Sequence, residues 1–441
     1  MKKTVNHILA AGLLALLSLA SCTDEFIEGN DLQGVDRDKR VEVRLPFGVG
    51  RGITTTITTR AAGGEIDYDS QLSGVMAFVY EAKSDNPEEN ELLAYHLFSN
   101  PSNKPLEGAT GGWIADNDDP TCGEIKFYVP VGDVYIYLLG NAQSSFLNFF
   151  PGVSGGDALG TQAEFFEKAT PKWNGNIHSV DGYLPLTGMV NNNTGLCHVN
   201  EQGQISYTDE EGKTHTLLPD GKHDEDNSFV LKRLMSKITM NIREGKGVKF
   251  TARDYTVRHI PHYVSPTAQA WTEEERDRIL VEDAKPVNFG LLDSLTFTIY
   301  LPENIRKVRS GVEITEYRQR DKVVKTADNK NTEETAPDDF HADNADNHKG
   351  HYKFEFAPKA STYIELTGWS ENADKTVAAD VRYYIHLGNF GKDLNHFSVE
   401  RDHHYTYNVT INGVDDIVVE VEDENEKTPG AEGVVFKHEA F

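Results

Sequence analysis

Short stretches in which every second residue is apolar recur along most of the chain, and this periodicity limits the fold more than any other feature. Alternation with period two places the apolar side chains on one face of an extended strand. The pattern is clearest over residues 41–47, 234–242, 352–356, 381–387 and 405–411. We therefore expect many half-buried strands, each with one face toward a core and one toward water.

Helical patterns are scarce by comparison. Only residues 161–169 and 271–283 have the spacing and composition of helices. Strands and helices do not alternate regularly, so the pattern favours an all-β sandwich over an α/β fold. The polar stretch 214–228 is the best candidate for a domain boundary, and the low-complexity polar stretch 326–350 is expected to be a mobile loop inside the second domain.

The N-terminus has the features of an export signal. Lys2 and Lys3 precede an apolar run over residues 8–20, which is too short to span a bilayer. The run ends in Leu-Ala-Ser followed by Cys22, which has the form of a bacterial lipobox. We expect residues 1–21 to be removed and Cys22 to carry the lipid that attaches the chain to a membrane. The alternative is an ordinary secretory signal with a cysteine nearby by chance.

Charge and cysteine content exclude several function classes. The formal net charge is −27, which repels phosphate backbones, so we expect no nucleic-acid partner. Beyond Cys22 the chain has two cysteines, Cys122 and Cys197, and the sequence leaves open whether they form a disulfide. Their spacing fits no zinc motif, so no metal site is predicted.

Four short motifs resemble catalytic, phosphate-binding or metal sites but lack the context that such chemistry needs. The Gly-x-Ser-x-Gly match at 152–156 follows a proline in a chain without α/β rhythm. The glycines at 48–52 lack the spacing of a phosphate-binding loop, and His403 and His404 would point to opposite faces of a strand. The fourth is a group of potential cation ligands without the calcium-loop pattern: His341, Asp343, Asp346 and His348. We predict neither an enzyme nor a cofactor.

Several segments, in this order, resemble the fimbrillin family, the subunits of Bacteroidales type V pili. They are the junction Thr59-Arg60-Ala61 and the stretches 71–81, 231–242, 297–304 and 381–421. Within them the matching residues include Tyr300, Glu303, Asn304, Leu387, Gly388, Phe397, Arg401 and Tyr405. One departure is Asp402, which follows Arg401 where the family usually carries asparagine. Together the segments cover nearly the whole chain.

The resemblance implies a fold and a domain order. The fold is two tandem transthyretin-like Greek-key β-sandwich domains with short helical insertions. Residues 22–60 would be a propeptide with a removable strand, 61–226 and 227–424 the two domains, and 425–441 a C-terminal tail. The implied function is a structural subunit of a cell-surface fimbria that contributes to adhesion.

The resemblance also implies how such a subunit assembles. An arginine-specific protease would cut between Arg60 and Ala61, and a strand from another fimbrial subunit would replace the removed one. Until then the subunit would be held at the outer membrane, on the cell surface, through the lipid on Cys22. The candidate removable strand carries Val41, Val43, Leu45 and Phe47, and the candidate donor strand carries Val434, Val435, Phe436 and Phe441.

Other interpretations of the same residues remain open. Arg60 could be an ordinary surface arginine, and the C-terminal tail could pack within its own subunit. A different function class is a surface glycan-binding lipoprotein of the outer membrane. That function would need exposed tryptophan platforms built from Trp113, Trp173, Trp271 or Trp369.

Overall fold

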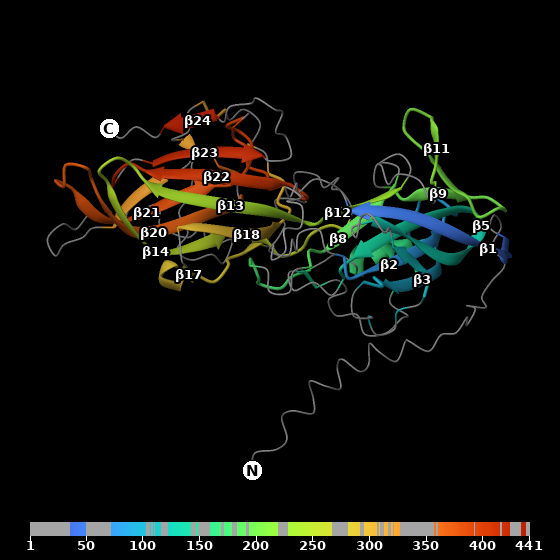
Figure 1. Cartoon of the computed structure of the whole chain (residues 1–441). Coiled ribbons are helices and arrows are strands. Elements are labelled where there is room, and N and C mark those ends of the chain that lie inside the picture. Colours follow the sequence, from blue (N-terminus) through green and yellow to red (C-terminus); the bar gives the residue numbers. More distant parts are fainter. Residues whose placement is uncertain are drawn as a thin grey trace, which may run out of the picture.

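In the computed structural model, the 19-residue strand β5 (Cys122–Gly140) organises the N-terminal half of the molecule (Figure 1). The structure describes residues 36–49, most of 72–218, of 228–326 and of 357–423, and 434–437. The first half of β5 pairs with β1 and β4, and its second half pairs with β2, β8 and β9. One long strand therefore pairs with different neighbours along its two halves and links all of them into one sheet.

This sheet has ten strands and encloses the first core. Its apolar side chains come from alternate positions of β1, β2, β5, β9, β10 and β12, as the period-two pattern predicts. The strands are β1 (Asp36–Val49), β2 (Gly74–Glu81), β3 (Leu92–Ser99), β4 (Trp113–Ala115), β5, β8 (Leu186–Met189), β9 (Leu196–Val199), β10 (Ile205–Thr208), β11 (Thr214–Thr216) and β12 (Phe229–Arg233).

The predicted helix near residue 161 covers the outer face of this sheet. It is α2 (Gln162–Lys168), a confirmed prediction within one residue at each end. Its Phe165 ring stacks on Tyr137 of β5, with ring centroids 5.0 Å apart, and lies 5.1 Å from the ring of Phe78 on β2. The Tyr137 hydroxyl also contacts the side-chain amide of Gln162. Aromatic packing thus attaches a short helix that would not be stable alone.

The C-terminal half is formed by two five-stranded sheets that face each other. One sheet has the order β18 (Thr296–Pro302), β13 (Met235–Glu244), β22 (His404–Ile411), β23 (Ile417–Asp423) and β24 (Val434–Lys437). The other has the order β17 (Val287–Asn288), β14 (Lys249–Arg258), β20 (Tyr363–Glu371), β21 (Ala378–His386) and β19 (Lys322–Thr326). In the first of these sheets β13 and β22 run parallel, while its other pairs are antiparallel.

Aromatic side chains join the two facing sheets. Tyr255 of β14 stacks on Phe297 of β18, across the two sheets, with ring centroids 3.9 Å apart. The buried residues of both sheets form one continuous core. The all-β class predicted from the sequence is therefore confirmed.

The chain passes from the first sheet to the second almost without interruption. β12 pairs with β1 and β8, whereas β13 pairs with β18 and β22, and Leu234 alone separates them. The change of sheet thus lies at Leu234, while the domain boundary at 226/227 stays a prediction. The polar stretch expected to form that boundary also contains the short strand β11. The sequence does not reveal this change of sheet, because β12 and β13 both bury alternate side chains.

Short elements near the junction connect the two halves. They are β6 (Leu147–Asn148) with β7 (Lys172–Trp173) and β15 (Ile260–Pro261) with β16 (Val281–Glu282), while the 3-10 helix η3 (Phe289–Leu291) follows β17 in the C-terminal half. The backbone N–H of Trp173 donates to the carbonyl of His262, 2.9 Å away, and that of Tyr300 donates to Ile177 at 2.8 Å. The second predicted helix is wrong at its C-terminal end, where Val281–Glu282 is a strand; its residues 271–280 lie outside the described part.

No helix in the described ranges is both long enough and apolar enough to cross a membrane. The polar stretch 326–350 is described only at Thr326, the last residue of β19, and the alternating residues 352–356 lie outside the described part.

Candidate functional site

The strand predicted to be removable, β1, contributes directly to the first core. Val43, Leu45 and Phe47 are fully buried, and Val41 is half-buried. Their neighbours in the sequence point to the outer face, where Arg44 Nη2 lies 2.6 Å from Glu124 Oε2. The strand is therefore amphipathic in the structure, as its alternation predicts.

Two strands hold β1 by backbone pairing. It runs antiparallel to β5 over most of its length, with Val43 opposite Phe127 and Leu45 opposite Ile125. It runs parallel to β12 only at its C-terminal end, where Phe47 lies opposite Phe229. Burial of its three apolar side chains contributes roughly 5–9 kcal/mol before ordering costs. This burial helps to hold β1 against the sheet.

The candidate donor strand occurs as an edge strand of its own subunit. Val434, Val435 and Phe436 belong to β24, which pairs antiparallel with β23 so that Val434 lies opposite Val421. β24 has one neighbour, β23, among the described strands, since the sheet ends there. Phe441 lies outside the described part. In the structure this part of the C-terminal tail therefore packs within its own subunit, which is one of the arrangements that the sequence left open.

Other predicted sites fall partly or wholly outside the described residues. Cys22, Arg60 and Ala61 lie there, as do Trp271, the Gly-x-Ser-x-Gly match and the histidine–aspartate group at 341–348. Cys122 and Cys197 are described and do not form a disulfide with each other. Cys122 begins β5 opposite Gly48, whereas Cys197 lies on β9 opposite Val134, much further along β5.

The tryptophans of the described part do not form an exposed platform. Trp173 is buried, and Trp113 and Trp369 are half-buried. The Trp113 ring packs edge-on against Phe47 of β1, with ring centroids 4.9 Å apart, so this tryptophan covers part of β1. Nothing in these positions favours the glycan-binding alternative.

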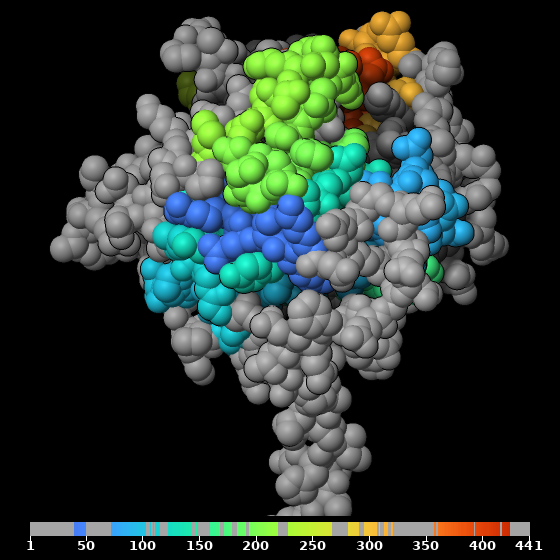
Figure 2. Space-filling model, turned by 90° about the vertical axis from the view of Figure 1, so that its right-hand side faces the viewer, coloured from blue at the N-terminus to red at the C-terminus, as the bar shows by residue number. Residues whose placement is uncertain are grey.

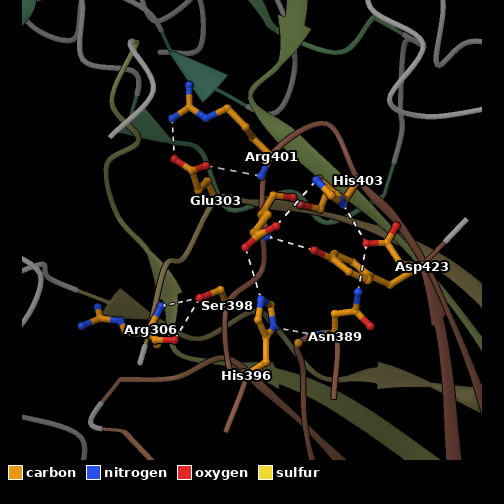
Figure 3. A network of polar contacts seen from close by, with 12 residues as sticks. Glu303, Arg306, Asn389, His396, Ser398, Arg401, His403 and Asp423 are labelled. Atoms are coloured by element: carbon orange, nitrogen blue, oxygen red, sulfur yellow. Dashed lines mark hydrogen bonds and ion pairs between the residues drawn. The ribbon is translucent and has the colours of Figure 1, made fainter. Parts of the chain in front are cut away.

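Glu303 and Asn304, two of the residues that carry the family resemblance, hold segments of the C-terminal half together beside the junction. Glu303 accepts from Arg401 at 2.5 Å (Figure 3). Asn304 donates from its amide to the carbonyl of Ala360 at 3.0 Å and to Thr362 Oγ1 at 2.8 Å. Ala360 has a φ of 59°, an unfavourable conformation for a residue with a Cβ, and the hydrogen bond from Asn304 helps to hold it. The motif is structural.

A polar network lies beside this junction, next to the end of β23 (Figure 3). His403 Nδ1 lies 2.8 Å from Asp423 Oδ2, and its Nε2 lies 3.6 Å from Glu400. His396 contacts the same Glu400 at 3.2 Å. Burial lowers the pKa of His403, but the hydrogen bond and charge of Asp423, with the charges of Glu400 and Asp402, outweigh burial, so its pKa lies above the ordinary value. His404 has a different partner, Thr239, so the two histidines act separately.

The described residues give no indication of a metal site. In the part of the chain that is described, no group of three or more histidine, cysteine, aspartate or glutamate side chains could hold a metal ion. The ionisable side chains of the junction are already engaged with one another, and the charges of Arg401 and His403 each lie beside a carboxylate.

Comparison with known proteins finds one matching family model and several similar solved structures. Residues 299–409 match a family model described as a domain of unknown function, DUF4906. No curated protein sequence matches. Among solved structures, the chain is similar to the tip fimbrial protein Mfa3 from Porphyromonas gingivalis, with 13% identity, a TM-score of 0.43, and coverage of 87% of this chain and 99% of that one.

A second similar structure is a putative cell adhesion protein from Parabacteroides distasonis. It is 10% identical, with a TM-score of 0.45 and coverage of 90% of this chain and 97% of the other. These solved structures include a fimbrial subunit. The predicted resemblance is confirmed as a resemblance.

Sequence reasoning missed two groups that matter for this site. Arg233 had no assigned partner, yet it forms a buried ion pair with Asp402 from a segment far along the chain. The departure from asparagine at Asp402 was the available signal, because a buried carboxylate needs a cation. Gly203, in the turn between β9 and β10, contacts the backbone of β1, and nothing in its local sequence indicates this contact.

Proposed function

We propose that the chain is a structural subunit of a cell-surface fimbria that contributes to adhesion. It is exported as a lipoprotein with the lipid on Cys22 and is held at the outer membrane. An arginine-specific protease cuts after Arg60, and other fimbrial subunits then join by strand exchange. The role is structural and adhesive, without catalysis.

The observation that supports this proposal is the position of β1. It is the first described strand, its Val43, Leu45 and Phe47 side chains are fully buried in the core, and residues 50–73 alone connect it to β2. A cut at Arg60 falls within that connection, so it would leave β1 held by non-covalent contacts only. Loss of β1 would expose one edge of the first half of β5 together with apolar side chains such as Ile125 and Phe127. Such an edge binds an incoming strand through ladder hydrogen bonds and alternate side chains.

The C-terminal tail is the natural source of that incoming strand. β24 is short and lies at the edge of its sheet, so it can leave without breaking the pairs of any strand beyond β23. Its alternate residues Val434 and Phe436 are apolar, as a strand that fills the β1 position requires.

The deciding experiment is mass spectrometry of the assembled protein from the native cell surface. The expected N-terminus is Ala61, and the variant Arg60→Ala should accumulate as unassembled lipoprotein. Arg51→Ala is the matched control, because it removes a neighbouring arginine and keeps the proposed cleavage site. Assembled fibres whose subunits still begin at a lipidated Cys22 would contradict the proposal.

A further inference from the structure

We propose that the turn between β9 and β10, residues 200–204, is a clip that retains β1 and sets the rate at which β1 leaves. This inference rests on the proposed function, in which a strand from another subunit replaces β1. The clip would keep an uncut subunit from exchanging strands too early, and it would have to open before the incoming strand could occupy the full length of the groove.

The clip meets β1 where backbone pairing is weakest. One edge of β1 pairs with β5 over most of its length, but β12 pairs with β1 only over residues 47–49. The β9–β10 turn approaches β1 in the remaining part, at Glu42 and Val43. Figure 2 shows this face of the molecule, with the blue atoms of β1 between the green atoms around β10 and β11 and the teal atoms of β5.

Gly203 makes this close approach possible. A Cβ added to Gly203 would overlap the carbonyl oxygen of Glu42, and the glycine has a φ of 75°, which side-chain-bearing residues adopt at a cost. The same turn contacts β1 a second time, because Lys39 Nζ lies 2.6 Å from Glu201 Oε1. Two contacts from one turn therefore fall on the N-terminal half of β1.

The turn is braced against movement. The Asn200 side-chain oxygen accepts the backbone N–H of Gln202 at 3.0 Å and that of Gln204 at 2.9 Å, and the Asn200 carbonyl accepts the N–H of Gly203 at 3.0 Å. The flanking residues Val199 and Ile205 are buried in the same core as β1. A turn held at both ends in this way gives a defined contact, so a change at its tip should be transmitted to β1.

Hydrogen exchange of the uncut chain tests the clip directly. In Gly203→Ala we expect the amides of residues 41–45 to exchange roughly fivefold to hundredfold faster than in the unsubstituted chain, the range expected for one methyl group too many at a packed contact. Amides of β13, which pairs with β18 and β22 in a different sheet, should be unchanged.

The matched control is Gly212→Ala in the neighbouring β10–β11 turn. Gly212 has a similar φ of 82°, but no atom lies within 4 Å of an added Cβ. This variant carries the backbone strain without the overlap, so β1 should exchange as in the unsubstituted chain. Equal rates in the unsubstituted chain and Gly203→Ala, or equal acceleration in both variants, would overturn the inference.

Reversing the charges of Lys39 and Glu201 supplies a second test that does not depend on Gly203. Lys39→Glu places two carboxylates together and should speed exchange of β1 by about twofold to fivefold, the modest effect typical of an exposed pair. The double variant Lys39→Glu/Glu201→Lys should restore the original rate. Failure of the double variant to restore it would argue against a contact that retains β1.

The clip and the proposed function can fail separately. After cleavage at Arg60, the chain is mixed with an excess of a synthetic peptide of residues 39–49, and loss of the original β1 is followed by mass spectrometry. If β1 never leaves the cut chain, the strand-exchange function is contradicted. The hydrogen-exchange rates of the uncut chain still test the clip in that case. If β1 leaves at the same rate from the unsubstituted chain and Gly203→Ala, the clip is contradicted and strand exchange stands.

Discussion

Arg233 and Asp402 form an ion pair where the two halves of the molecule meet, with Nη1 of the arginine 2.8 Å from Oδ1 of the aspartate. Both residues are buried, at 1% and 8% exposure. Arg233 ends β12, and Asp402 lies in the turn before β22 with a φ of 60°. Aspartate and asparagine tolerate this left-handed conformation better than most residues, so Asp402 serves the turn and neutralises the arginine at once.

We predict that Asp402→Ala lowers the free energy of unfolding by about 3–5 kcal/mol, because it leaves a buried guanidinium without its carboxylate. Asp402→Asn should cost less, since asparagine keeps a hydrogen-bond acceptor and suits the turn. Urea unfolding measures both values. The exposed pair Arg253–Asp380 provides the control, because Asp380→Ala should cost less than about 1 kcal/mol. Equal losses in the three variants would show that burial of the Asp402 pair has no special role.

The contact between His403 and Asp423 predicts a pH-dependent contribution to stability. The pKa of His403 lies above its ordinary value of 6.5, so the stabilisation is fully present below about that pH and is lost as the pH rises through the raised pKa. The groups that face this imidazole are Asp423, Glu400 and Asp402. Hydrogen bonding from His396 is the main cause that lowers the pKa of Glu400, which therefore stays ionised in this range.

The measurement compares the original chain with His403→Gln by urea unfolding between pH 5.5 and 8.5. We expect a difference of roughly 1–3 kcal/mol at the acid end, as for a hydrogen bond to a charged group, and a smaller difference at the alkaline end. His198→Gln, which removes an exposed histidine that lies 2.7 Å from Asp133, serves as the control for replacing a histidine by glutamine. A gap that widens as the pH rises would contradict the assignment.

Arg320 is fully buried between two aromatic rings. Its guanidinium lies 3.8 Å from the ring centre of Phe397 and 4.6 Å from that of Phe390, and it donates to the carbonyls of Leu387 and Leu394. We predict that Arg320→Lys destabilises the C-terminal half by roughly 2–4 kcal/mol, because an ammonium group cannot stack and donate in two fixed directions together. Thermal unfolding checks this, with the exposed Arg253→Lys as the control. A change within about 0.5 kcal/mol would refute the structural role of the planar group.

The two cysteines should differ in reactivity as separate thiols. Burial raises the pKa of Cys197 far above its ordinary value, whereas Cys122 is half-buried at the start of β5. In a chain that begins at residue 23, iodoacetamide should modify Cys122 under native conditions and both thiols only after unfolding. Native modification of neither, with recovery of both after reduction, would indicate a disulfide instead.

The sequence predicted the strands better than their arrangement. Alternation identified β1, β13, β21 and β22, because burial on one face is a local property of the strand. It could not show that β12 and β13 belong to different sheets, since both strands bury alternate residues in the same way. Pairing partners depend on contacts between residues far apart, such as Arg233 and Asp402, which local patterns do not contain.

The candidate site was predictable to a similar extent. The burial of Val43, Leu45 and Phe47 followed from their spacing. The cis pairing of β24 with β23 was one of two alternatives that composition could not separate. The approach of Gly203 to Glu42 was not predictable, because glycine in a polar turn looks the same whether or not another strand lies beside it.

The direct passage from β12 into β13 has a mechanical consequence. Both strands lie along the long axis of the molecule (Figure 1), and one residue separates them. Tension between the two ends of the subunit would therefore follow an almost straight covalent path through Leu234. Ladder bonds that join β13 to β18 and β22 would then be loaded in shear, many at once, so that rupture requires them to break together rather than one after another.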